Sequence, residues 1–269
     1  MTRFLVVPQW QGSPAARAML LADGAEAIAG DLPRSACTRI DVPVEAGESL
    51  DTGIRRFSAL TRVRDALIEA LAASDENALV VGGDCSVAVS AIAHAATRHP
   101  GLAVVWFDAH GDLHSPDTSL SGAFAGMALR AVYTDTAFGE AAVAPERVVL
   151  AGAREFDDAE WDAVTADGIH HVPVDDLGDH ARVADIVEAT GADAVYVHID
   201  LDVLDPGMLS GVSQPVPFGA SLEQLTGALR ELRTRFQLVG GSISGFAPAS
   251  PVAAIDDLGT ILRVIGALA

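Results

Sequence analysis

The sequence contains no lysine, and all 17 of its basic side chains are arginine. Against them stand 37 aspartate and glutamate residues, which give the 269-residue chain a formal net charge of −20. No stretch gathers the arginines into a basic patch, so nucleic acid and anionic membrane surfaces are poor candidates as partners. Half of the residues are apolar, and the charges are scattered among them, which predicts a large core.

Cysteine is also scarce, because Cys37 and Cys85 are the only two. Two cysteines in a chain of this length do not form the disulfide framework of a small secreted protein. No run reaches the roughly 18 consecutive apolar residues of a transmembrane helix. The apolar run after Met1, at residues 4–7, is too short for the core of a signal peptide. We therefore expect a cytoplasmic protein.

Short apolar runs alternate along the chain with segments of helical periodicity, as at Leu60, Val63, Leu67 and Leu71. This alternation predicts an α/β fold with a mainly parallel central sheet that is covered by helices on both faces. We treat residues 1–269 as a single domain. The expected strands are 4–7, 78–81, 102–107, 147–151, 171–174, 194–199 and 238–243, and further helices are expected at 16–29, 86–98, 158–166, 181–190, 221–235 and 253–268.

Acidic side chains stand where two of these strands end. Asp108, His110 and Asp112 alternate after one strand, and Asp200 and Asp202 close another. Alternating positions put their side chains on one face, and ligands bind beyond the carboxyl ends of parallel strands. So many carboxylates in one place repel each other unless cations lie between them. The pattern therefore predicts a two-metal hydrolytic site.

A third segment, with two glycines before an acid, follows the strand expected at 78–81. Together the three segments resemble, in order, the signatures of the ureohydrolase family, which includes arginases and agmatinases. The resemblance implies an arginase-like three-layer α/β/α fold and a pair of Mn(II) ions. The three segments are Gly82-Gly83-Asp84-Cys85-Ser86, Asp108-Ala109-His110-Gly111-Asp112 and Asp200-Leu201-Asp202-Val203-Leu204-Asp205-Pro206.

The resemblance also implies roles for individual residues. Asp108 and Asp200 would bridge the two metals, and a water held between the metals would become a hydroxide near neutral pH and attack the substrate carbon. Asp112 would be the catalytic residue that accepts a hydrogen bond from this hydroxide and passes a proton to the leaving amine. The implied metal ligands are Cys85, Asp108, His110, Asp112, Asp200 and Asp202.

Cys85 departs from the family pattern, which has histidine at this position. A thiolate is softer than imidazole and carries a charge, so it should favour Zn(II) or Fe(II), although the oxygen-rich surroundings still suit Mn(II). The alternative is an inert, buried cysteine.

Two further departures concern the guanidinium end of an arginine substrate. Ala125 replaces a histidine that is thought to relay protons in arginases, and Gly245 falls where arginases place a glutamate facing the guanidinium. A buried guanidinium normally needs a carboxylate partner, so ordinary arginine hydrolysis is not the first expectation.

The amino-acid end of the substrate resembles the family more closely. Asp157 and Ser121 match residues that hold the α-amino and α-carboxylate groups, Ser119 stands where arginases have threonine, and His114 where they have asparagine. His198 shares a strand face with the second acidic pair and either supports the metals from behind or is an ordinary strand-end histidine.

A hydroxylated guanidine is less basic and binds without the missing glutamate. We therefore predict hydrolysis of Nω-hydroxy-L-arginine to hydroxyurea and L-ornithine, a reaction of the cysteine-containing branch of the family in antibiotic biosynthesis. One alternative is an ordinary ureohydrolase that releases urea from arginine or agmatine. The others are a single-metal amide deacylase using Asp108, His110 and Asp200, and a non-catalytic metal-binding subunit. The expected partner is a small guanidino amino acid, and a homo-oligomer is possible.

Overall fold

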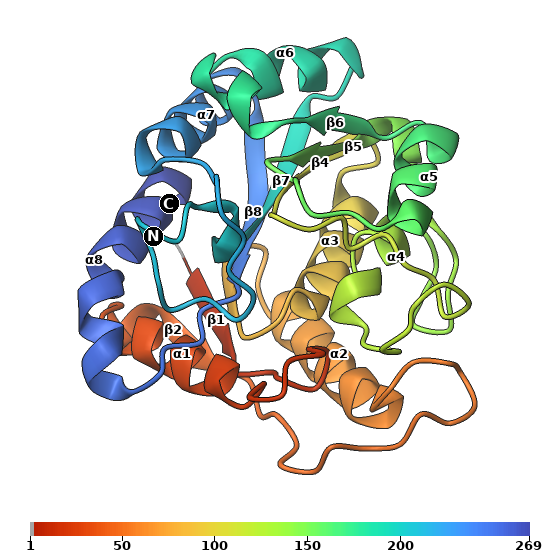
Figure 1. The fold of residues 1–269 in the computed structure, drawn as a ribbon, viewed down its shortest axis with the longest axis vertical. Coiled ribbons are helices and arrows are strands. Elements are labelled where there is room, and N and C mark those ends of the chain that lie inside the picture. The colour runs from red at the N-terminus through yellow and green to blue at the C-terminus, as the bar shows by residue number, and fades with distance from the viewer. Residues whose placement is uncertain (1–2) are drawn as a thin grey trace.

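The computed structural model describes residues 3–269, and these form one eight-stranded sheet in which neighbouring strands pair in parallel (Figure 1). Residues 1–2 lie outside the described part. The strands are β1 (Arg3–Val7), β2 (Cys37–Arg39), β3 (Ala78–Gly82), β4 (Leu102–Phe107), β5 (Val148–Ala151), β6 (His170–Val172), β7 (Ala194–Asp200) and β8 (Gln237–Ser244). Their order across the sheet is β2-β1-β3-β8-β7-β4-β5-β6.

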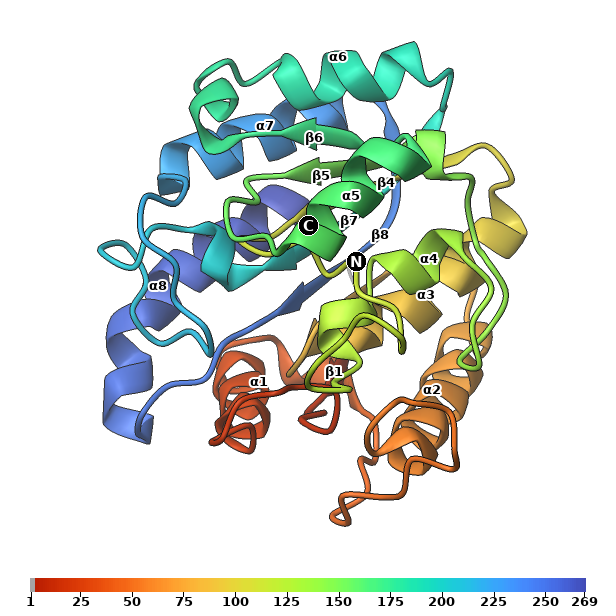
Figure 2. The same ribbon diagram turned by 45° about the vertical axis from the view of Figure 1, so that its right-hand side comes forward.

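Helices cover both faces of this sheet. They are α1 (Leu20–Gly30), α2 (Phe57–Ala72), α3 (Ser86–Arg98), α4 (Arg130–Tyr133), α5 (Asp158–Asp167), α6 (Arg182–Ala189), α7 (Leu222–Arg235) and α8 (Pro251–Leu268). Apolar residues of α2, α3, α4 and α5 pack on one face, and those of α1, α6, α7 and α8 pack on the other (Figures 1 and 2). The predicted three-layer α/β/α architecture is confirmed.

Successive residues of the central strands pack into the apolar cores on opposite faces of the sheet. Val80 of β3 lies in the core on the face that α3 covers, whereas Val81 lies in the core on the face that α1 covers. All six residues of β4 are buried, which explains why this strand reads as a continuous apolar run. Its last two residues, Trp106 and Phe107, are fully buried on opposite faces. Burial of a phenylalanine side chain alone stabilises the fold by about 1.5–3 kcal/mol.

The predicted elements agree with the structure within two residues at each end, except at the sheet edge, in short segments and at the start of the first helix. The helix expected at 16–29 is wrong at its start, because α1 begins at Leu20 and turns occupy residues 16–19. The strand expected at 171–174 is wrong in its second half, because β6 stops at Val172 and Pro173 precedes a 3₁₀ helix, Val174–Gly178. Proline lacks the N–H that a ladder requires. The three-residue edge strand β2 and the one-turn helix α4 were not predicted, since neither is long enough to show a period.

The motif-bearing strands are neighbours in the centre of the sheet. β3 carries the glycine-rich segment, β4 the first acidic segment and β7 the second, and β8 lies between β3 and β7. Because all of these strands are parallel, their carboxyl ends meet on one edge, where α/β sheets bind ligands. The sheet order therefore brings together segments that are more than one hundred residues apart.

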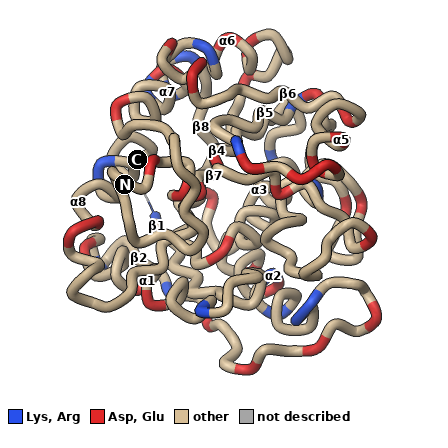
Figure 3. Tube along the Cα trace, viewed as in Figure 1, with Lys and Arg blue, Asp and Glu red and all other residues tan. Residues whose placement is uncertain are grey.

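The distribution of charge agrees with the sequence. Figure 3 shows arginines scattered along the trace among more numerous acidic positions. Among residues 3–269, no helix is both long and apolar enough to cross a lipid bilayer.

Candidate metal centre

The six predicted ligands lie together in one cavity of about 190 Å³ at the carboxyl ends of the central strands. The cavity is lined by Cys85, Asp108, His110, Asp112, Asp200 and Asp202. Five of them are buried, and His110 is half-buried. The six residues thus lie together as the sequence predicts, and their binding of metal stays a prediction.

Asp108 stands between two groups of donors. Its Oδ2 lies 3.9 Å from the Cys85 Sγ, and its Oδ1 lies 3.4 Å from the His110 Nδ1. In the first group, the Cys85 thiol donates a hydrogen bond to the Asp200 Oδ2 at 2.9 Å. On the other side, His110 Nδ1 lies 3.0 Å from the Asp202 Oδ2. The Asp108 carboxylate therefore faces both groups of candidate ligands.

Local backbone hydrogen bonds fix the orientation of these acids. The Asp108 Oδ1 accepts from the His110 N–H at 2.7 Å, and the Asp200 Oδ1 accepts from the Asp202 N–H at 2.9 Å. The Asp202 Oδ1 accepts from the Ala109 N–H at 3.0 Å and so ties the end of β7 to the end of β4. These bonds use one oxygen of each carboxylate. The other oxygen of Asp108 accepts from the Trp106 Nε1–H at 3.1 Å, and the other oxygens of Asp200 and Asp202 face Cys85 and His110.

Asp112 adopts a left-handed backbone with φ of +53°. Non-glycine residues rarely adopt this conformation, and such strain gathers at functional sites. The buried Oδ2 of Asp112 has no hydrogen-bond partner within the described chain. An orphaned buried carboxylate oxygen is costly unless a cation or a reacting group meets it.

The electrostatics of the cluster demand positive charge. Burial, followed by repulsion from Asp108, raises the pKa of Asp112 well above the usual aspartate range. Burial, followed by repulsion from Asp202, does the same to the pKa of Asp200. Burial opposes protonation of His110, but its hydrogen bonds to Asp108 and Asp202 raise its pKa to about 12. Protons bound to these three residues therefore offset the negative charge that a bound cation would otherwise neutralise.

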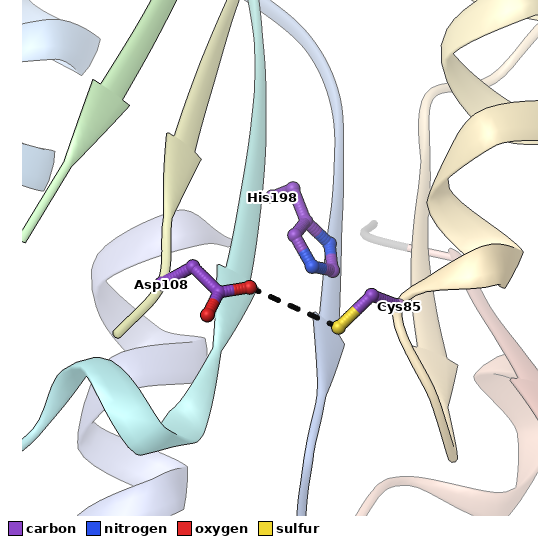
Figure 4. A group of neighbouring side chains, drawn as sticks. All are labelled: Cys85, Asp108 and His198. Atoms are coloured by element: carbon purple, nitrogen blue, oxygen red, sulfur yellow. Dashed lines mark hydrogen bonds between the residues drawn. The ribbon is translucent and has the colours of Figure 1, made fainter. Parts of the chain in front are cut away.

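The donor set fits two cations. The ligand atoms of Asp108, His110 and Asp202 lie within 4.8 Å of one another, and so do those of Cys85, Asp108 and His198 (Figure 4). Asp108 belongs to both groups. Carboxylate, imidazole and thiol donors suit Mn(II), Fe(II), Co(II) and Zn(II).

His198 comes from the inner part of β7 and is fully buried. Its Nδ1 lies 2.8 Å from the Ser242 Oγ of β8, and its ring packs on the Trp106 ring with centroids 3.8 Å apart. Burial lowers the pKa of His198 to about 3, so the imidazole is neutral. The sequence left open whether this residue supports the metals or is an ordinary strand-end histidine. The structure places it beside Cys85.

The predicted substrate contacts divide into two pairs. His114 and Ser121 line the cavity. Asp157 caps α5 and lies 3.1 Å from the His114 Nε2 through its Oδ2, whereas the Ser119 Oγ accepts from the Gly122 N–H in the loop. Asp157 therefore adjoins the cavity through His114, and Ser119 supports the loop that carries Ser121.

Several residues that line the cavity were not predicted, and Glu160 and Gln214 are two of them. Glu160 is buried, and its two carboxylate oxygens accept from the N–H groups of Leu113 and Asp157. A signal for Glu160 existed, because Asp157 and Glu160 have the spacing of a capping box. Gln214 also lines the cavity, from the loop after β7, and no sequence pattern marks it.

Gly245 follows β8 with φ of +88°. A Cβ atom at this position would lie 2.1 Å from the Asp200 Oδ1, far inside van der Waals contact. With the Asp200 carboxylate in this position, the backbone leaves no room for a side chain at residue 245. The lack of an acidic side chain at residue 245, noted from the sequence, therefore has a steric cause.

Comparisons with known proteins agree with this architecture. The family model described as "Arginase family" matches residues 19–255. The chain is 31% identical over 206 residues to an arginase of Staphylococcus aureus, covering 71% of this chain and 68% of that one. It is 29% identical over 209 residues to the N(omega)-hydroxy-L-arginine amidinohydrolase of Streptomyces lavendulae, covering 77% and 74%. The crystal structure of Bacillus caldovelox arginase superposes with a TM-score of 0.82 at 25% identity, covering 99% of both chains.

Proposed function

The chain belongs to the arginase family of metal-dependent hydrolases that cleave amidine carbon–nitrogen bonds, and on this premise we propose that it hydrolyses Nω-hydroxy-L-arginine to hydroxyurea and L-ornithine. The observation that carries the choice of substrate is the Asp200 carboxylate, which occupies the space of a side chain at residue 245. A positively charged guanidinium therefore finds no carboxylate projecting from that position. An N-hydroxyguanidine is less basic and enters the site as a neutral group, at a lower desolvation cost.

We propose that the metal-binding residues are those of the sequence prediction. One cation would be held by Cys85 and Asp112, the other by His110 and Asp202, with Asp108 and Asp200 shared. When bound, a pair of divalent cations supplies a water nucleophile that is activated at neutral pH. Mn(II) is the proposed native ion, with Zn(II) or Fe(II) as alternatives because of the thiol.

Asp112 is the proposed proton carrier. Its unpartnered Oδ2 lies in the cavity and accepts the proton that the attacking water loses. A carbon–oxygen bond forms at the amidine carbon, and the bond from this carbon to the side-chain nitrogen of ornithine breaks. Asp112 then gives its proton to this nitrogen, so that ornithine leaves as a neutral amine and the carboxylate is restored.

The amino-acid end of the substrate would be held by His114 and Ser121. Both residues line the cavity, and Asp157 supports His114. Ala125 also lines the cavity, where it offers no titratable group. The protein would therefore depend on Asp112 for proton transfer and would have no histidine relay at residue 125. The single domain and the cytoplasmic location expected from the sequence stay predictions.

Product identification tests this proposal. The purified protein is loaded with Mn(II) and given Nω-hydroxy-L-arginine or L-arginine in separate reactions, and hydroxyurea, urea and ornithine are each quantified. We expect hydroxyurea and ornithine in equal amounts from the first substrate and little urea from the second. Urea from arginine as the main product, with hydroxyarginine left intact, would overturn the proposal. An Asp112→Asn control separates catalysis from background hydrolysis.

An ordinary arginase activity is the second candidate. It is favoured by the similarity to curated arginases, which reaches 33% identity over 207 residues for the protein of Bacillus caldovelox. The same assay decides between the two candidates, because urea and hydroxyurea are distinct products. Metal analysis addresses the single-metal deacylase alternative, since the proposed site requires two cations per chain.

A further inference from the structure

An additional donor lies at the Cys85 end of the cluster. His198 precedes Asp200 by two residues on β7, so the two side chains share a strand face. The ligand atoms of Cys85, Asp108 and His198 all lie within 4.8 Å of one another, as the converging side chains in Figure 4 show. Bonds of about 2.0–2.3 Å to a zinc-like cation place its ligand atoms within roughly 4.6 Å of one another. Small movements of these three side chains would therefore allow them to bind one ion.

The surroundings of His198 direct one ring nitrogen toward this position. The Nδ1 faces the Ser242 Oγ at 2.8 Å, and the ring lies against Trp106. When the Nδ1 proton is donated to Ser242, the lone pair is on Nε2. This is the usual arrangement of a metal-bound histidine, whose second nitrogen donates to a neighbouring group that fixes the ring.

The Nε2 has no committed partner. It lies 3.4 Å from the Ser244 Oγ, but that hydroxyl also lies 3.2 Å from the Asp200 Oδ2 and 3.4 Å from the Cys85 Sγ. A hydroxyl group carries one proton. If Ser244 donates to the charged carboxylate, which is the stronger acceptor, the buried Nε2 keeps its lone pair free.

We infer that His198 is a ligand, through its Nε2, of the cation held beside Cys85. This inference rests on the proposed two-metal function and deepens it. The family pattern places an imidazole at residue 85, and here the sequence has a thiol instead. His198 would restore an imidazole to the same cation from β7, so that this cation is held by sulfur, nitrogen and carboxylate oxygen. At this position such a mixed set binds Co(II) and Zn(II) more tightly than Mn(II), whereas the oxygen-rich position beside His110 still suits Mn(II).

Cobalt(II) substitution of the full chain tests the assignment, because its spectra report ligands without any need for turnover. X-ray absorption at the cobalt edge counts imidazole ligands, and equilibrium dialysis counts cobalt per chain. We expect two Co(II) ions in the wild type, a sulfur-to-cobalt charge-transfer band, and two imidazoles per pair of ions from His110 and His198. In His198→Gln, we expect one imidazole per pair and more than roughly 100-fold weaker binding at one of the two positions.

Two further variants separate ligation from packing. Val197→Ala changes a buried residue of the same strand whose side chain packs in the core on the other face of the sheet, and it is expected to leave cobalt binding and spectra unchanged. Ser242→Ala removes the anchor of Nδ1 but keeps the imidazole. It should weaken binding by about 10–100-fold with the imidazole count intact.

The outcomes distinguish the two proposals. Two bound cobalt ions with a single imidazole per pair in the wild type would overturn the His198 assignment and leave the two-metal function standing. Unchanged affinity and spectra in His198→Gln would do the same. A wild type that binds no cobalt would overturn both. Because His114 lines the same cavity beside Asp157 and Glu160, the imidazole count is also measured in His114→Gln. A count that stays at two in this variant supports the His198 assignment even if the His198→Gln protein fails to fold, and a count that falls to one would overturn it.

Discussion

Substituting Gly245 with alanine should damage the metal site although the change adds a single methyl group. The residue has φ of +88°, which alanine adopts only with strain. The new Cβ would lie 2.1 Å from the Asp200 Oδ1 and 2.7 Å from its Cγ. The collision moves either the backbone after β8 or the carboxylate that we propose as a metal bridge.

The expected loss of stability follows from the backbone strain and from the collision. A left-handed backbone costs a non-glycine residue about 1–2 kcal/mol, and overpacking at a tight buried site costs about 1–3 kcal/mol. The sum predicts a loss of about 2–5 kcal/mol in unfolding free energy, or roughly 4–20 °C in Tm for a chain of this size. A displaced bridging ligand should also weaken metal binding by at least about 10-fold.

Gly168→Ala is the matched control. Gly168 has φ of +78° at the C-terminal cap of α5, and nothing lies within 4 Å of its Cβ position. This variant has the backbone strain without the collision, so we expect a loss of about 1–2 kcal/mol and normal metal affinity. Thermal unfolding with and without Mn(II), together with metal titration, measures both quantities. Equal losses of stability in the two variants, with unchanged metal affinity in Gly245→Ala, would refute the steric argument.

Three further predictions follow from the site. Asp112→Asn should lower kcat by about 10²–10⁴-fold in the product assay, because the proton acceptor is lost. Circular dichroism should show that the variant stays folded. Near-normal turnover would contradict the role of Asp112. Cys85→His should raise Mn(II) affinity relative to Zn(II) in competition titrations, since imidazole replaces a soft thiolate, and an unchanged preference would indicate that residue 85 is not a ligand. The metal-free protein should lose stability as the pH rises above the usual aspartate range of about 4, because the raised pKa values of Asp112 and Asp200 favour the folded state only while these groups are protonated. Thermal unfolding in chelator at several pH values checks this sign, and Mn(II) should remove the trend.

The parts of the fold that are buried on both sides could be predicted from the sequence. The strand at 102–107 agrees with β4 at both ends, because its six apolar residues stop where the acidic segment begins. The helix starting at Ser86 also agrees, although it has no side-chain cap. The edge strand β2 is half-exposed and three residues long, so neither composition nor period distinguishes it from a loop.

The clustering of the candidate ligands was predictable because each motif directly follows a central strand. The neighbours of these ligands were not, since they depend on which strands lie side by side. Ser242 approaches His198 only because β8 pairs with β7, and the sequence gives no register for that pair. The collision at Gly245 likewise depends on the approach of Asp200 from another strand. Local patterns predict elements and chemistry, whereas contacts between distant strands require the assembled sheet.

Anomalous diffraction from crystals soaked in Mn(II) tests the central claim most directly. The account predicts two separate manganese peaks per chain, both contacted by Asp108 and Asp200, with Cys85 beside one peak and His110 beside the other. A single peak, or manganese located away from these carboxylates, would contradict it.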